Sequence, residues 1–258
     1  MKHLLYIIAL FTLFSFTKDE GKPKFIKAKF DTFTTDNLGN IYIVSNDEIK
    51  KYNKKGELLK IFSNKKAGKI FSIDASNALR VLVFYKDQSQ VIILDSQLTQ
   101  NGDAVDLLNM NLEQSDLICS SFNNGMWLYN RQNAELVRLD DKLNKAVSTG
   151  NLNTLLNLEL KPLYITENSG YVYLSDTKNG VLMFDIYGTY YKTISVFGLK
   201  SFQVSEDRLY YYKDSTLSSY HTKQLSTYDS LFAKPYPKQV NWSNGTVYKM
   251  YTDSLAWE

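Results

Sequence analysis

The amino-acid sequence predicts an all-β protein, a six-bladed β-propeller whose ring is closed by a strand from the N-terminal end. Three observations support this fold class. Aromatic residues make up 14% of the chain and hydrophobic residues 44%, a composition that suits pleated sheets around a buried core. A hairpin phrase recurs at intervals of about 40 residues, and the two ends of the chain supply strand fragments that complete each other.

Residues 1–17 have the pattern of a signal peptide. A basic start precedes an apolar run from Leu4 to Phe16, and Lys18 and Asp19 follow it. The run is shorter than the roughly 20 residues that a membrane-spanning helix needs. Ser15 and Thr17 make a poor cleavage site, which leaves an uncleaved anchor as the alternative, and the lack of a following cysteine argues against a lipoprotein. We expect a soluble periplasmic or otherwise exported protein, not transmembrane after signal cleavage.

The propeller is expected to span residues 22–258, where one β-hairpin phrase occurs six times. Each copy places a polar turn, mostly with glycine or asparagine, before an apolar-alternating run, which is a hairpin signal. The copies are DNLGNIYIV, SNALRVLVF, FNNGMWLYN, ENSGYVYLS, SEDRLYYYK and WSNGTVYKM. The first apolar residues after the turns are Ile41, Val81, Trp127, Val172, Leu209 and Val247, with intervals of 40, 46, 45, 37 and 38 residues.

A second hairpin follows each of the first five turns. It opens with a polar residue after an apolar or aromatic one, at Asn53, Asp95, Asp140, Asp185 and His221. The short side chain of Asn or Asp bonds the backbone two residues on and so starts a turn. Each unit therefore contains four short antiparallel strands, which is typical of a propeller blade and less suited to a β-sandwich.

The ends of the chain predict how the ring closes. The sixth unit, Lys238 to Glu258, has room for three strands only, while an unassigned strand, Lys22 to Phe30, precedes the first unit. Donation of the N-terminal strand to the last blade would remove an open edge from the ring. We therefore predict a 3+1 closure.

The turn DNLGNIYIV followed by YNKKGELLKIF resembles the repeat of six-bladed propellers in the NHL and YncE-like group. The resemblance covers Lys22 to Glu258 and is closest in the first and fourth units. Leu79 and Arg208 stand at the usual glycine position in the second and fifth units. The resemblance implies the propeller fold, and some similar propellers are lactonases that hold a divalent cation over the channel.

Two connections between predicted blades, Asp103 to Asp116 and Asn151 to Pro162, are long and rich in leucine. Exposed apolar loops often mark a partner site, so these side chains are the candidate partner-binding residues. They are Leu107, Leu108, Met110, Leu112, Leu155, Leu156 and Leu158. The alternative is that they fold back, as short helices, and cover the hydrophobic spaces between blades.

The segment from Lys50 to Lys69 contains eight lysines and one acidic residue. It would make the outer rim of the first blade positive, and an acidic partner or an anionic lipid surface could bind there. The favoured interpretation is a solvated hairpin whose lysines protect an outer edge strand from pairing with other chains.

Candidate catalytic, metal-binding and cofactor residues are not found. Of the six predicted starts of inner strands, Asp31 and Asp116 are acidic and the others are mostly neutral, which does not supply the oxygen ligands that calcium needs. The two histidines are His3, in the predicted signal peptide, and His221. No zinc site or catalytic triad that needs paired imidazoles can therefore be assembled in the predicted propeller. Cys119 lies in an apolar-alternating run, where we expect a small buried side chain.

We therefore predict a non-enzymatic, exported propeller that acts as a protein-binding scaffold or accessory subunit in the cell envelope, similar in role to propeller subunits of outer-membrane assembly or secretion complexes. A metal-dependent, lactonase-like hydrolase and a glycan-binding propeller are the alternatives. The aromatic side chains that could stack on sugars are Trp127, Trp242, Trp257 and Tyr210 to Tyr212, although packing between blades is their ordinary role. The formal charge of +3 is not typical of a nucleic-acid-binding domain, and no cofactor is expected.

Overall fold

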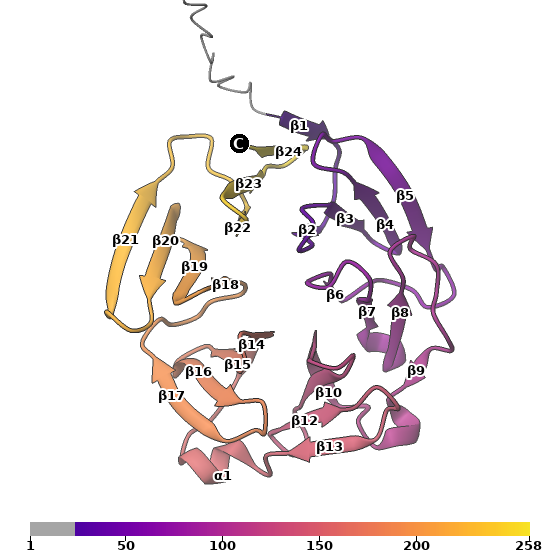
Figure 1. Ribbon diagram of the computed structural model, residues 1–258, viewed down its shortest axis with the longest axis vertical. Coiled ribbons are helices and arrows are strands. Elements are labelled where there is room, and N and C mark those ends of the chain that lie inside the picture. Colours follow the sequence, from indigo (N-terminus) through magenta and orange to yellow (C-terminus); the bar gives the residue numbers. More distant parts are fainter. Residues whose placement is uncertain (1–23) are drawn as a thin grey trace, which may run out of the picture.

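The computed structural model describes residues 24–258, and it confirms the six-bladed β-propeller. Figure 1 shows six sheets around a central axis, ordered along the chain so that each blade lies beside the next. Each sheet has four strands, paired antiparallel. The predicted signal peptide, residues 1–17, lies outside the described residues.

Each blade has one strand at each of four radial positions. The innermost strands are β2 (Thr32–Thr35), β6 (Ser72–Asp74), β10 (Ser115–Ser120), β14 (Pro162–Asn168), β18 (Gln203–Ser205) and β22 (Gln239–Ser243). The second strands are β3 (Ile41–Ser45), β7 (Val81–Tyr85), β11 (Met126–Asn130), β15 (Tyr171–Asp176), β19 (Arg208–Lys213) and β23 (Thr246–Met250). The blades are numbered here in this order.

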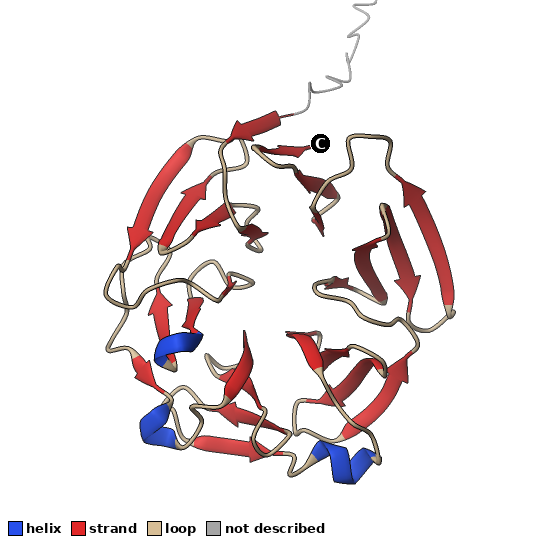
Figure 2. Ribbon diagram, turned by 180° about the vertical axis from the view of Figure 1, so that it is seen from behind, coloured by secondary structure: helices blue, strands red, loops and turns tan. Residues whose placement is uncertain are grey.

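The outer half of each blade follows the same plan. The third strands are β4 (Glu48–Tyr52), β8 (Gln90–Leu94), β12 (Glu135–Leu139), β16 (Gly180–Asp185), β20 (Thr216–His221) and β24 (Ser254–Trp257). The outermost strands are β5 (Leu58–Ser63), β9 (Val105–Asp106), β13 (Lys145–Ser148), β17 (Tyr190–Ile194), β21 (Ser226–Leu231) and β1 (Lys24–Lys27). The short helices are η1 (Lys86–Gln88), η2 (Leu108–Met110) and α1 (Leu152–Leu156), near the periphery of the ring (Figure 2).

Strand β1 closes the ring, as the sequence predicted. It is the outermost strand of blade 6 and pairs antiparallel with β24, with Lys24 opposite Trp257 and Lys27 opposite Ser254. The closing strand ends at Lys27, before the predicted Phe30, because the chain then turns toward β2. Ile26 faces the core between blades 6 and 1, so the closure is packed as well as hydrogen-bonded.

Polar side chains hold the outer turns as expected from the repeat. In the turn after β4, the side-chain oxygen of Asn53 accepts the backbone N–H groups of Lys55 (2.9 Å) and Glu57 (3.0 Å). Asp95, Asp140 and Asp185 form the same pair of bonds in blades 2, 3 and 4. In blade 5 the Nδ1 atom of His221 accepts from the backbone N–H groups of Lys223 and Gln224, each at 3.3 Å. A histidine thus takes the place of the aspartate in that turn.

Buried apolar side chains fill five of the spaces between blades. The clusters lie between blades 1 and 2, 2 and 3, 3 and 4, 4 and 5, and 6 and 1. Between blades 5 and 6 the described residues form a different contact, in which Tyr210 stacks on Trp242 with ring centroids 4.1 Å apart. This junction therefore has less apolar packing than the others.

The lysine-rich segment lies mainly on the outer strands of blade 1. Leu58, Leu59 and Ile61 of β5 are exposed beside Lys60, which is consistent with lysine protecting an edge strand. Lys51 is an exception to the expected positive rim, because it is buried and its Nζ atom donates to the carbonyl of Ser96 at 2.8 Å. That lysine contributes to packing between blades 1 and 2.

The described residues, 24–258, include no helix that is long and apolar enough to cross a membrane.

Candidate functional site

The two faces of the disc differ in the connections that they carry. Because each blade has four antiparallel strands, every outermost strand ends on the face where the next innermost strand begins. The connections between blades therefore share one face, which we call the loop face. Five of these loops are residues 64–71, 107–114, 149–161, 195–202 and 232–238; the sixth, residues 28–31, joins β1 to β2 and carries no large exposed apolar residue. The turns between first and second strands and between third and fourth strands lie on the opposite face, which we call the turn face.

The structure divides the predicted partner-binding leucines into two groups. Leu107 and Leu112 are buried in the cluster between blades 2 and 3, and Met110 packs against it. Leu156 and Leu158 pack against the cluster between blades 3 and 4. For Leu107 and Leu112 the prediction of an exposed binding side chain is wrong, because both residues flank helix η2 and pack into the core between blades 2 and 3.

Leu108 and Leu155 are the exposed members of the predicted set. Their side chains are 62% and 61% exposed, and both lie in the short helices of the loop face. The buried leucine of α1 is Leu152, which the sequence had not singled out. Helix α1 thus directs Leu152 inward and Leu155 outward, while η2 leaves Leu108 exposed between the buried Leu107 and Leu112. The capping and the binding interpretations each describe part of these loops.

The loop face carries more exposed apolar side chains than the sequence indicated. Phe71, Phe197 and Tyr236 are 50%, 47% and 47% exposed, and each lies in one of three further loops between blades. With Leu108 and Leu155 they place one large exposed apolar residue in each of these five loops. Their loops lack the repeated leucines of the loops that contain Leu108 and Leu155, so amino-acid composition did not indicate these exposed aromatic residues.

The turn face also has exposed apolar residues, but they occupy hairpin turns. Leu38 and Leu79 lie between first and second strands, and Tyr187 and Leu225 lie between third and fourth strands. These exposed apolar residues can serve as a control for those of the loop face, because they are chemically similar and lie on the opposite face of the disc.

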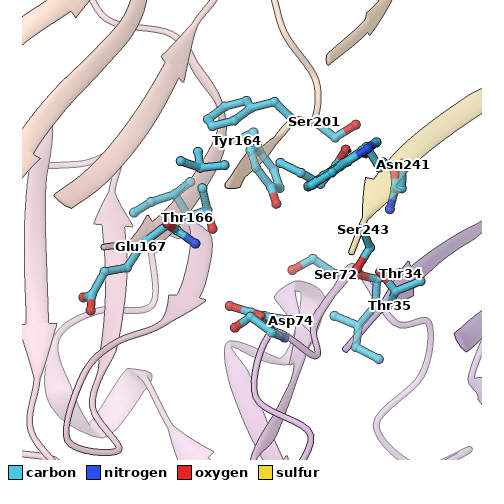
Figure 3. Close-up of a pocket in the computed structure, with 18 of the residues that line it drawn as sticks. Thr34, Thr35, Ser72, Asp74, Tyr164, Thr166, Glu167, Ser201, Asn241 and Ser243 are labelled. Carbon is cyan, nitrogen blue, oxygen red and sulfur yellow. Dashed lines mark hydrogen bonds between the residues drawn. The ribbon is translucent and has the colours of Figure 1, made fainter. Parts of the chain in front are cut away.

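The central channel contains a cavity of about 680 Å³, and inner strands of several blades line it. Figure 3 shows hydroxyl and amide side chains from different blades around one open space, among them Thr34, Ser72, Ser201, Asn241 and Ser243. Hydroxyl and amide groups therefore form part of the channel wall, together with acidic side chains such as Asp36, Asp74 and Glu206.

Two carboxylates at the channel are engaged in bonds between blades. One oxygen of Asp74 in blade 2 accepts the backbone N–H of Ser120 in blade 3 at 2.6 Å, and the other accepts that of Ser76 at 2.8 Å. Glu167 in blade 4 turns its carboxylate away from the open space (Figure 3) toward Trp127 and Phe122 of blade 3. Both groups thus tie neighbouring blades together near the turn face.

The acidic residues considered for a cation site are paired with basic side chains. Asp116 lies 2.7 Å from the Nζ atom of Lys86 and 3.3 Å from the Nε atom of Arg131. Asp31 lies 3.5 Å from the Nζ atom of Lys69. Within residues 24–258, no three Asp, Glu, His or Cys side chains gather closely enough to hold a metal ion.

The potential nucleophile and base identified in the sequence serve structural roles. Cys119 is buried, as expected, and burial raises the pKa of its thiol well above the ordinary value, with the negative charge of Asp74 adding to the effect. His221 lies at the end of β20, in an outer hairpin, where its Nδ1 atom holds the turn. The proposed sugar-stacking residues Trp127 and Trp257 are buried in cores between blades.

No family model matches the chain, and no curated protein matches it. Solved structures do match. Virginiamycin B lyase from Staphylococcus aureus aligns with 14% identity and a TM-score of 0.61 over 89% of this chain and 81% of the lyase. The WD40 domain of Neurospora crassa Pan2 aligns with 12% identity and a TM-score of 0.59 over 86% of this chain and 75% of that domain.

A third similar structure is the extracellular domain of the putative hybrid two-component system BT3049 from B. thetaiotaomicron. It aligns with 12% identity and a TM-score of 0.57 over 87% of this chain and 33% of that chain. The matched structures include an enzyme, a WD40 domain and an extracellular domain, so the likeness at these identities concerns the propeller fold.

Proposed function

We propose that this protein is a non-catalytic propeller scaffold that binds a protein partner in the cell envelope through its loop face. The observation that carries the proposal is the presence of one large exposed apolar residue in each of five of the six loops between blades. Leucine and aromatic side chains distributed over one rigid face are suited to a partner surface, because burying them on binding releases water from apolar area.

The engagement of reactive groups supports a binding role over catalysis. Asp74 and Glu167 already accept protein hydrogen bonds, and His221 holds an outer turn. One solved virginiamycin B lyase is a catalytically inactive variant in which a histidine is replaced by alanine. In this chain His221, the histidine within the described residues, lies at the periphery of blade 5 and not among the residues that line the channel.

The location is part of the same proposal. The basic start and apolar run of residues 1–17 support export by a signal peptide. The turn sequences, such as DNLGNIYIV, support placement in the NHL and YncE-like group of six-bladed propellers, whose repeat they resemble. A role as an accessory subunit of an outer-membrane assembly or secretion complex fits an exported scaffold that binds its partner through the loop face.

The test compares two sets of surface substitutions in the full chain. The loop-face set is Phe71→Ser, Leu108→Ser, Leu155→Ser and Phe197→Ser, and the matched turn-face set is Leu38→Ser, Leu79→Ser and Leu225→Ser. All seven side chains are at least 47% exposed, so both sets should keep the thermal unfolding midpoint of the wild type.

Affinity-tagged proteins are used to capture partners from envelope extract, and the captured proteins are quantified by mass spectrometry. We expect a specific partner to be retained by the turn-face set and reduced at least about tenfold by the loop-face set, since the lost apolar contacts are worth more than 1.4 kcal/mol together. Retention of the partner by the loop-face set would contradict the proposal. If only the turn-face set loses the partner, the interface lies on the turn face and the proposal is wrong.

A further inference from the structure

The central channel has the size and enclosure of a small-molecule site. Its volume is about 680 Å³, which lies within the roughly 300 to 1,000 Å³ that ligand pockets occupy. Its walls include residues of the innermost strands of all six blades, so the polar groups that face the channel are placed by the ring of sheets.

Four hydroxyl groups face this space without a hydrogen-bond partner among residues 24–258. Thr34, Ser72, Ser201 and Ser243 come from blades 1, 2, 5 and 6 and all line the channel (Figure 3). No group of residues 24–258 forms a side-chain hydrogen bond with any of the four hydroxyls, whereas the neighbouring hydroxyl of Thr32 donates to Gln239 at 2.9 Å. A serine or threonine hydroxyl can donate one hydrogen bond and accept two. The four groups therefore hold unused capacity of both kinds.

Two amides add donors to the same wall. The Oε1 atom of Gln203 accepts the backbone N–H of Trp242 at 3.0 Å, and the Oδ1 atom of Asn241 accepts from Gln239 at 3.2 Å. These bonds fix the carbonyl end of each amide. The NH₂ groups of Gln203 and Asn241, which line the channel, form no bond with another group of residues 24–258 and remain available as donors.

The charges of the wall disfavour an anionic ligand. Asp36, Asp74, Glu167 and Glu206 line the channel, and Lys200 is the basic residue among its lining. The first three carboxylates already accept bonds from protein donors, so they give the channel a negative potential without needing a cation to satisfy their oxygens. A phosphate or carboxylate on a ligand would be repelled.

We infer that the channel binds a neutral, hydroxyl-rich ligand of the size of a mono- or disaccharide, held by the hydroxyls of Thr34, Ser72, Ser201 and Ser243. A sugar presents hydroxyls that both donate and accept, and these match the capacity of the wall. The phenol of Tyr164 points into the same space (Figure 3) and adds another such group. The channel shares Ser201 and Phe71 with loops of the loop face, but the inference rests on the hydroxyl groups of the channel wall and does not depend on the proposed protein partner.

The experiment measures binding of defined sugars to the full chain. Glucose, galactose, N-acetylglucosamine, maltose and lactose are tested by saturation-transfer difference NMR, and the dissociation constant of the strongest is measured by calorimetry. Glucose 6-phosphate is the charged probe. We expect at least one neutral sugar to bind and the phosphorylated sugar to bind more weakly than glucose. Absence of binding for every neutral sugar, or tighter binding of glucose 6-phosphate, would overturn the inference.

Two variants locate the site. Replacing both hydroxyls in Thr34→Val and Ser243→Ala should weaken binding about tenfold, because two net hydrogen bonds are lost. The matched control is Thr227→Val with Ser230→Ala on the exposed outer strand β21, which should bind as the wild type does. Unchanged binding by the Thr34 and Ser243 variant would overturn the assignment.

A third variant covers the case in which the double substitution fails to fold. Ser201 lies in the loop before β18 and lines the channel, so Ser201→Leu should fill part of the cavity while leaving the strands intact. We expect it to abolish sugar binding at an unchanged thermal unfolding midpoint. Full binding by this folded variant would place the sugar elsewhere and overturn the inference.

Discussion

Glu167 links blades 3 and 4, and its removal should weaken the propeller measurably. One carboxylate oxygen accepts from the Oγ atom of Ser121 at 2.6 Å and from the Nε1 atom of Trp127 at 2.7 Å. The other accepts the backbone N–H of Phe122 at 2.9 Å. Arg138 supports the same turn, since its Nε atom donates to the Oγ atom of Ser121 at 2.8 Å. The substitution Glu167→Ala removes the acceptor for all three donors.

The cost can be worked from the surroundings of each donor. Ser121 and Phe122 are half-buried and can be hydrated again in the variant. Trp127 is fully buried, so its indole N–H would be left without an acceptor, which costs about 1 to 3 kcal/mol. With the loss of two further hydrogen bonds to a charged group, partly offset by water, we expect the free energy of unfolding to fall by about 2 to 4 kcal/mol.

Urea unfolding followed by tryptophan fluorescence measures this loss, with Trp127 as a probe within the affected contact. The matched control is Glu206→Ala, since Glu206 is an exposed glutamate in the corresponding turn of the next blade; it should change stability by less than about 0.5 kcal/mol. Glu167→Gln should give an intermediate loss, because its amide keeps one acceptor oxygen. A loss below about 1 kcal/mol for Glu167→Ala would refute the assignment of this carboxylate as a link between blades.

Three further outcomes are expected from urea unfolding. Tyr85→Phe should raise the free energy of unfolding by up to about 1 kcal/mol, because the Tyr85 hydroxyl is buried without a partner among the described residues; a loss of that size would contradict this. Ile26→Ala in the closing strand should cost about 2 to 4 kcal/mol and the exposed neighbour Phe25→Ala little; equal effects would argue against packing of the closure. Burial raises the pKa of Tyr85, Tyr129 and Tyr173 to about 12 each. Because unfolded tyrosines ionise near pH 10, the free energy of unfolding should be full below pH 10 and fall between pH 10 and 12. Equal free energies of unfolding at pH 8 and pH 11 would contradict this.

The fold could be predicted because the residues of the repeated turn motif hydrogen-bond to residues close to them in sequence. Asp36 illustrates this: its carboxylate accepts the backbone N–H groups of Leu38 (3.0 Å) and Asn40 (2.8 Å) and the hydroxyl of Tyr42 (2.9 Å). All partners lie within six residues, so the motif is visible in one short stretch of sequence. The closing strand was also predictable, because the sixth unit has room for only three strands and an unassigned strand precedes the first unit.

The site was less predictable because it depends on contacts between blades. Whether a loop leucine points inward depends on the cavity that it meets, so Leu107 and Leu108 are neighbours in sequence but opposite in exposure, 0% and 62%. The link from Glu167 to Trp127 crosses 40 residues of sequence. Thr34, Ser72, Ser201 and Ser243 come from four different blades and have no shared motif, so only the assembled ring brings them to one channel.

Hydrogen exchange of the full chain, alone and bound to the protein that it captures from the envelope, tests the scaffold proposal most directly. Binding through the loop face should slow exchange in residues 107–114 and 151–161 and leave residues 36–40 and 140–144, on the turn face, unchanged. Slower exchange confined to the turn-face segments, or no change in either set, would contradict the proposal.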